Sequence, residues 1–195
     1  MTASLARFIS FLFNPILLLV FVPFFLLLRN GNDFTKALFW TGYTSIFLSA
    51  MTVFLAYSVK KKIITDMDVS KRTQRPLVFL VSILLIVAYL SGLYLLHGPR
   101  LLSVIAVGIM IGIILASIIN LRLKASMHVA AISALIFALA IVYNGFYLFS
   151  LFLIPLVAWA RLKIRRHTLP ETVVGGLLGV LLSLCIYALS KVFVS

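Results

Sequence analysis

Long, continuous apolar stretches separated by short polar segments make up most of this sequence. A transmembrane helix needs about 20 predominantly apolar residues, whereas a membrane-spanning strand alternates apolar and polar positions. The apolar stretches here are continuous, so they predict helices. Seven candidate spans follow, at about residues 8–28, 37–58, 77–96, 101–121, 127–143, 146–160 and 172–193.

Turn-forming residues separate several of these spans. Gly98-Pro99-Arg100 divides the third from the fourth, and Asn144-Gly145 divides the fifth from the sixth. The sixth stretch is short and contains Pro155, which membrane helices tolerate. The first stretch is too long for the apolar core of a cleaved signal peptide, so we expect a retained helix there.

The composition points to lipid as the surroundings of these helices. Of the 195 residues, 64% are hydrophobic, and the mean hydropathy is +1.22. A soluble domain of this size is closer to half apolar. We therefore predict an all-α, polytopic transmembrane helix bundle of about six to seven spans, in which residues 1–195 form a single integral membrane domain. The lone Cys185 has no partner for an internal disulfide.

The charge is strongly biased, because 17 Lys and Arg residues oppose four acidic residues, for a net charge of +13. In a soluble protein this excess would indicate nucleic acid as a partner. Here the bases lie between apolar spans. The predicted partners are therefore membrane lipids with anionic headgroups, or a phosphate ligand, and no nucleic acid.

The bases are also shared unequally between the two faces of the predicted bundle. If all seven stretches cross the membrane, the N-terminus and the loops around 59–76, 122–126 and 161–171 lie on one face. That face holds 13 of the 17 bases, namely Arg7, Lys60, Lys61, Lys62, Lys71, Arg72, Arg75, Arg122, Lys124, Arg161, Lys163, Arg165 and Arg166. The positive-inside rule makes this face cytoplasmic. We predict a location in the cell (inner) membrane.

Three polar clusters lie on this same face, at residues 66–76, 124–128 and 161–171. Together they contain two of the three histidines and three of the four acidic residues. Histidines and carboxylates close to several cations are the side chains that phosphoryl-transfer chemistry uses.

These clusters resemble the signature of the type 2 phosphatidate phosphatase (lipid phosphate phosphatase) superfamily, over residues 66–179. The family pattern is K-x6-R-P, then P-S-G-H, then S-R-x5-H-x3-D. The matching positions are Arg75-Pro76, Ser126, His128, Arg161 and His167, with Glu171 at the position of the final Asp. The sequence departs from the pattern at Asp68 in place of Lys, at Ala125 and Met127 in place of Pro and Gly, and at Ala160 in place of Ser.

The resemblance implies a phosphatase that needs no metal or other cofactor and acts on a lipid phosphate or polyprenyl diphosphate, such as phosphatidate or phosphatidylglycerol phosphate. It implies that His167 is the nucleophile and forms a phosphohistidine, that Glu171 orients it, and that His128 protonates the leaving group. Side chains that stabilise charge on the phosphoryl oxygens would complete the site. These are Arg161, Ser126, Arg75, Arg72, Lys71 and Lys124.

Other interpretations of the same residues stay open. Thr168-x-x-Glu171 is also a capping box for the last helix, and Gly175-x3-Gly179 suits close helix packing. The departures at Asp68 and Met127 favour an alternative, in which the bundle is catalytically inactive and binds lipid phosphate, or acts as a transporter or scaffold.

Overall fold

The computed structural model describes residues 2–193 and has helices but no strand within that range, which confirms the all-α prediction. Two short 3₁₀ helices, η1 and η2, accompany the α-helices. The elements are α1 (Thr2–Leu12), α2 (Pro15–Arg29), α3 (Phe34–Lys60), η1 (Arg72–Gln74), α4 (Arg75–Leu95), α5 (Arg100–Ile119), α6 (Met127–Val142), η2 (Gly145–Phe152), α7 (Leu153–Lys163) and α8 (Leu169–Phe193).

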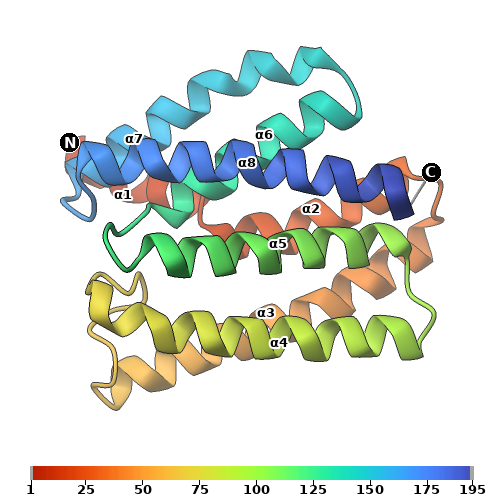
Figure 1. Ribbon diagram of the computed structural model, residues 1–195, viewed down its shortest axis with the longest axis horizontal. Helices are drawn as coiled ribbons and strands as arrows, with labels where there is room; N and C mark the ends of the chain where they lie inside the picture. The colour runs from red at the N-terminus through yellow and green to blue at the C-terminus, as the bar shows by residue number, and fades with distance from the viewer. Residues whose placement is uncertain (1, 194–195) are drawn as a thin grey trace.

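The long helices run side by side along one common direction (Figure 1). The loops 61–71, 120–126 and 164–168 all lie at the end of the bundle where the chain begins, on the left in Figure 1. We call this the polar end. The three polar clusters of the sequence therefore come together, although up to about 100 residues separate them along the chain.

Five helical segments are long and apolar enough to cross a membrane, and the bent pair α1 and α2 would be a sixth, so the chain is an integral membrane protein. The predicted sixth span is one of the five, because η2 and α7 together form a segment over residues 145–163. α6 has only 16 residues, or roughly 24 Å at 1.5 Å per residue, and so is short for a hydrocarbon core of about 30 Å.

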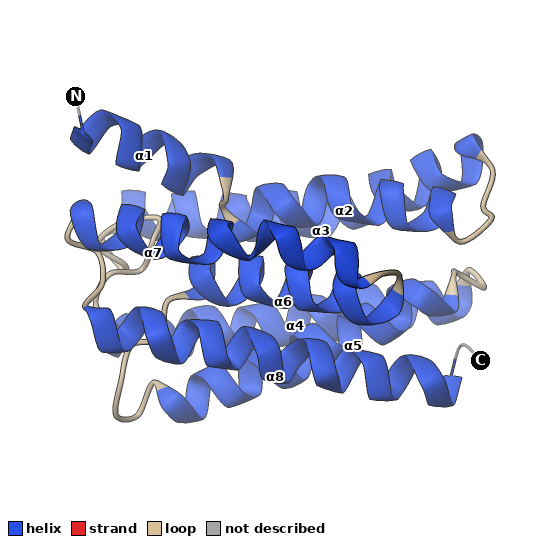
Figure 2. Cartoon of the chain, turned by 90° about the horizontal axis from the view of Figure 1, so that it is seen from above, coloured by secondary structure: helices blue, strands red, loops and turns tan. Residues whose placement is uncertain are grey.

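The prediction of one continuous first helix is wrong. The chain breaks after Leu12, and α1 and α2 meet at an angle of 45° (Figure 2). Pro15 explains the break, because it has no N–H and its ring disfavours helical backbone at the preceding residue. Asn14 caps the new helix, with its side-chain oxygen accepting a hydrogen bond from the Ile16 N–H at 2.9 Å. α1 packs against α7 and lies at the polar end of the bundle.

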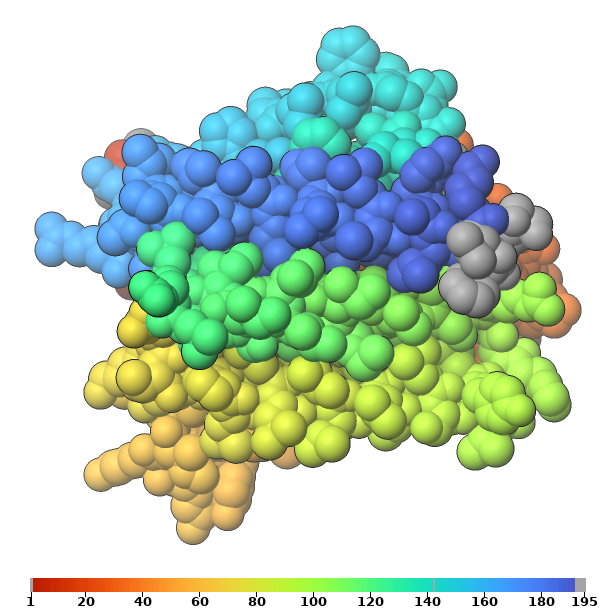
Figure 3. Space-filling view, in the orientation of Figure 1, coloured from red at the N-terminus to blue at the C-terminus, as the bar shows by residue number. Residues whose placement is uncertain are grey.

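α8 lies in very close contact with α6 and also packs on α5, running the length of the face seen in Figure 3. A Cβ atom at Gly175 would lie 2.5 Å from the carbonyl oxygen of Ser126, and one at Gly179 would collide with the backbone of Ala130. Both glycines therefore permit the close approach, as their spacing predicted. The Ser126 N–H also donates to the Glu171 carbonyl at 3.0 Å, which joins the starts of the two helices.

Candidate active site

His167 and Glu171 form a hydrogen-bonded pair where the loop enters α8. The His167 Nδ1 and Glu171 Oε2 atoms are 2.8 Å apart, and the same carboxylate oxygen accepts the Thr168 N–H at 3.1 Å. Glu171 thus caps the helix and holds the histidine at once. Because a carboxylate only accepts hydrogen bonds, the proton of His167 lies on Nδ1, and Nε2 keeps its lone pair.

His167 is buried, and cations surround it. Burial, and then the positive charges of Arg161, Lys124 and Arg75, lower the pKa of His167 to about 2. The imidazole is therefore neutral at physiological pH and able to act as a nucleophile.

Arg161 lies at the end of α7 and is almost completely buried, with 2% of its surface exposed. Its Nη2 is 3.0 Å from Asp68 Oδ2, and its Nη1 donates to the Ser10 hydroxyl of α1 at 2.6 Å. Its Nε has no hydrogen-bond partner among the described residues. An unpaired buried donor is costly, so this guanidinium has unused capacity to bind an anion.

Asp68 is the anion that Arg161 holds in this structure. Burial raises the pKa of Asp68, but the positive charge of Arg161, with smaller contributions from His128 and Arg166, outweighs it and holds the pKa below its ordinary value. Asp68 is therefore ionised at neutral pH. Its carboxylate pairs with the buried guanidinium of Arg161 at 3.0 Å.

Arg75, the first residue of α4, is buried and joins two loops of the polar end. Its Nε donates to the Val69 carbonyl at 3.3 Å and its Nη1 to the Ala125 carbonyl at 2.8 Å. These two bonds fix the 61–71 loop against the start of α6. Arg75 thus positions backbone as well as bringing positive charge to the site.

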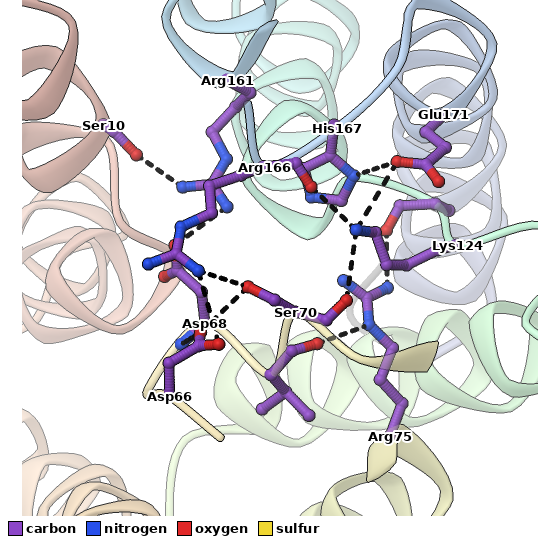
Figure 4. Close-up of polar contacts among 12 residues, drawn as sticks. Ser10, Asp66, Asp68, Ser70, Arg75, Lys124, Arg161, Arg166, His167 and Glu171 are labelled. Atoms are coloured by element: carbon purple, nitrogen blue, oxygen red, sulfur yellow. Dashed lines mark hydrogen bonds and ion pairs between the residues drawn. The ribbon is translucent and has the colours of Figure 1, made fainter. Parts of the chain in front are cut away.

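A second layer of polar contacts surrounds this core (Figure 4). Arg166 donates to the Ser70 hydroxyl at 2.6 Å and pairs with Asp66 at 3.3 Å. Lys124 donates to the carbonyls of Arg166 and Ser70 at 2.8 and 3.2 Å, and its Nζ is 3.8 Å from Glu171. Burial lowers the pKa of Lys124, and Glu171 opposes that shift. The three clusters are therefore cross-linked by side chains of both signs.

A cavity of about 310 Å³ opens between these residues and runs into the bundle. Both candidate histidines and both buried arginines line it. The charged or ionisable lining side chains at the polar end are Asp68, Arg75, His128, Arg161 and His167. The rest of the lining is almost entirely apolar.

The remaining predicted phosphate-binding residues lie outside the cavity lining. Ser126 is fully buried, and its hydroxyl has no hydrogen-bond partner in residues 2–193. Arg72 donates to the carbonyls of Leu121 and Arg122 at 3.1 and 2.7 Å, so it binds the loop that follows α5. Lys71 is exposed on the loop. Lys124 has its Nζ 3.8 Å from Glu171 and donates to the carbonyls of Ser70 and Arg166.

Sequence analysis missed Ser10 and Ser70, and it assigned Arg166 no place in the site. Ser10 lies in an apolar helix that the sequence merges with α2, so nothing in the pattern directs it toward Arg161. Arg166 and Ser70 do lie within the polar clusters, and their polarity was the available signal.

No family model, curated protein or solved structure matches this chain. Within residues 2–193, no group of three or more His, Cys, Asp or Glu side chains is arranged to hold a metal ion. The chemistry of the site is therefore argued from its own geometry.

Proposed function

We propose that this protein is a membrane-embedded phosphatase that hydrolyses a lipid phosphate or polyprenyl diphosphate through a phosphohistidine intermediate. One observation carries the proposal. His128, His167, Arg75 and Arg161, which come from three separate clusters of the sequence, line the same cavity, and most of that cavity is apolar. A phosphate head and an apolar tail both have matching surfaces there.

In the first step, the Nε2 lone pair of His167 attacks phosphorus, and the bond from phosphorus to the lipid oxygen breaks. Glu171 stabilises the positive charge that develops on the imidazole. His128 gives a proton to the departing alkoxide. Burial and the positive charge of Arg161 lower the pKa of His128 to about 4, and the negative charge of the bound phosphate opposes this shift and favours the protonated form before transfer. Arg161 and Arg75 stabilise the charge on the phosphoryl oxygens.

In the second step, water attacks the phosphorus of the phosphohistidine. The P–N bond breaks, its electron pair returns to Nε2, and His128 takes the proton from the attacking water. Inorganic phosphate leaves, and both histidines are restored. Each step uses only side chains that line the cavity or touch one that does.

The test is release of inorganic phosphate by the detergent-purified protein from a panel of lipid phosphates and diphosphates. We expect His167→Asn to lower turnover at least 10³-fold, because the nucleophile is lost. His97→Asn is the matched control, since His97 is exposed at the opposite end and Asn tolerates its positive φ of 52°. Turnover by His167→Asn at the wild-type rate would refute the mechanism.

A second candidate is a catalytically inactive protein that binds lipid phosphate. The Asp68–Arg161 ion pair at 3.0 Å favours it, because a carboxylate already neutralises the main anion-binding cation. This candidate predicts binding of a lipid phosphate without turnover, and loss of binding in Arg161→Ala. Detection of an acid-labile phosphohistidine at His167 by mass spectrometry would exclude it.

We place the site on the cytoplasmic face of the cell (inner) membrane, on the strength of the charge bias. In a Cys185→Ser background, Lys71→Cys should resist an impermeant maleimide in intact cells, and Arg100→Cys, exposed at the other end, should react. Labelling of Lys71→Cys in intact cells would reverse this assignment.

A further inference from the structure

A second group of polar side chains lies at the end of the bundle opposite the polar end, where α2 and α6 finish (Figure 1). Arg29 is the last residue of α2, and its Nη1 donates to the Tyr147 hydroxyl of η2 at 3.0 Å. Its guanidinium carbon lies 4.3 Å from the centre of the Tyr143 ring, a distance at which the ring face attracts a cation. Asn30 donates to the Tyr143 hydroxyl at 2.9 Å. Two tyrosines therefore hold this arginine in place.

The charge of Arg29 is not neutralised by the protein. Among residues 2–193, Arg29 forms no ion pair with a carboxylate, and Asp33, the nearest acidic residue in the sequence, pairs with Lys36 at 3.4 Å. Arg29 is exposed, and it uses one of its five N–H donors on Tyr147. A planar guanidinium can bind a phosphate through two parallel hydrogen bonds. Arg29 therefore offers both charge and donors to a phosphate.

An apolar groove leads from Arg29 toward the middle of the bundle. Phe25, Leu26 and Leu28 of α2 line one side and Leu139 of α6 the other, and the arginine and the two tyrosines complete the lining. The apolar residues precede the polar ones along both helices, so they lie deeper in the bundle. α2 packs mainly on α3 and touches α6 only lightly, which leaves the groove between them. A ligand that fits this surface has an anionic head and a hydrocarbon part.

The tyrosines indicate the depth of this group in the membrane. Tyrosine is enriched at the level of the lipid headgroups. α6 has 16 residues and begins at the polar end, so it ends no further than the boundary of a hydrocarbon core about 30 Å thick. Tyr143 directly follows α6 and contacts Arg29, which places the guanidinium at headgroup level. The anions present at that depth are the phosphates of lipids.

We infer that the groove between α2 and α6 binds an anionic phospholipid of the leaflet opposite the polar end. The lipid phosphate would bind Arg29, and the hydrocarbon would lie along the groove and fill the loose contact between the two helices. No residue that lines this groove also lines the cavity with the two histidines. The inference is therefore independent of the proposed phosphatase activity.

The experiment locates the lipid by photocrosslinking. The full-length protein is placed in phosphatidylcholine nanodiscs that contain a small fraction of phosphatidylglycerol with a diazirine in its acyl chain, and mass spectrometry identifies the labelled peptides. Wild-type protein should be labelled within residues 25–29 or 139–147. Unlabelled phosphatidylglycerol should compete for this labelling about fivefold better than phosphatidylethanolamine, which is the effect of one cation at a membrane surface. Absence of label from both segments, or equal competition by the two lipids, overturns the inference.

Two arginine substitutions test the role of Arg29. Arg29→Gln should lower the labelling of these two segments about fivefold, while labelling at the polar end stays within about twofold. Arg100→Gln is the matched control, because Arg100 is an exposed arginine at the same end that does not line the groove, and it should leave the labelling within about twofold. Equal labelling of Arg29→Gln and wild type overturns the inference. The competition in wild-type protein needs no variant, so it tests the inference even if Arg29→Gln does not fold.

Discussion

Asp68→Asn is the most informative single substitution in this site. Asp68 Oδ2 lies 3.0 Å from Arg161 Nη2, and the side chains are 24% and 2% exposed. The substitution keeps the shape of the side chain and removes its charge. In the proposed site, a phosphate must compete with this carboxylate for Arg161, so the variant should be less stable alone but bind phosphate more tightly.

The structure sets the size of both effects. Removal of one partner from a buried ion pair costs about 3–5 kcal/mol. Asp68 is about one-quarter exposed, and the amide oxygen of Asn can still accept a hydrogen bond from Arg161, so we expect a loss of about 2 kcal/mol in the free energy of unfolding. Without the competing carboxylate, the Kd for inorganic phosphate should fall about tenfold, which corresponds to about 1.4 kcal/mol.

The assay is thermal unfolding in detergent at pH 7, in phosphate and in chloride at equal ionic strength. At 100 times its Kd, a ligand stabilises the folded state by about 2.7 kcal/mol, so phosphate should restore Asp68→Asn to near wild-type stability. Asp33→Asn is the control, since Asp33 is an exposed helix cap at the other end and Asn also caps well. Equal stabilisation of wild type and Asp68→Asn by phosphate would refute the competition.

Three further predictions follow from other contacts. Glu171→Gln should lower kcat about 100-fold with little change in unfolding temperature, because Gln keeps the helix cap and the hydrogen-bond acceptor for His167 Nδ1 but not the negative charge. Steady-state kinetics will measure kcat, and calorimetry will measure the unfolding temperature. In the unfolded chain His167 takes up a proton below about pH 6.5, whereas in the folded protein its pKa is about 2 and it does not, so the free energy of unfolding should fall as the pH drops below about 6.5. The His167→Asn variant should therefore have an unfolding temperature that depends less on pH between 7 and 5. Parallel curves of unfolding temperature against pH for the variant and the wild type would contradict this. Gly175→Ala should cost about 2 kcal/mol of stability and also reduce turnover, because its Cβ would press on the Ser126 carbonyl and move α8; unchanged melting and unchanged kinetics would contradict this.

The continuity of the apolar stretches was enough to predict the helices apart from the break in the first one, since lipid permits few other backbone structures. It also predicted that the three polar clusters lie at one end of the bundle, because the number of membrane crossings determines which loops are on the same side. The apolar pattern could not predict which individual side chains contact one another. Ser10 meets Arg161 only because the chain turns at Asn14, and that turn is a local backbone effect inside an apolar stretch. The pairing of Asp68 with Arg161 depends on the path of the 61–71 loop, which Arg75 holds through main-chain carbonyls.

The hydrogen bond from the Ser126 N–H to the Glu171 carbonyl means that backbone atoms, as well as the Lys124 side chain, align the two clusters that carry the candidate histidines. His128 follows one partner of this bond by two residues, and His167 precedes the other by four. Replacements at Met127, which lines the cavity, can therefore change the shape of the cavity without changing the register between the histidines. A library of substitutions at this one position would test whether the side chain there determines which headgroup the cavity accepts.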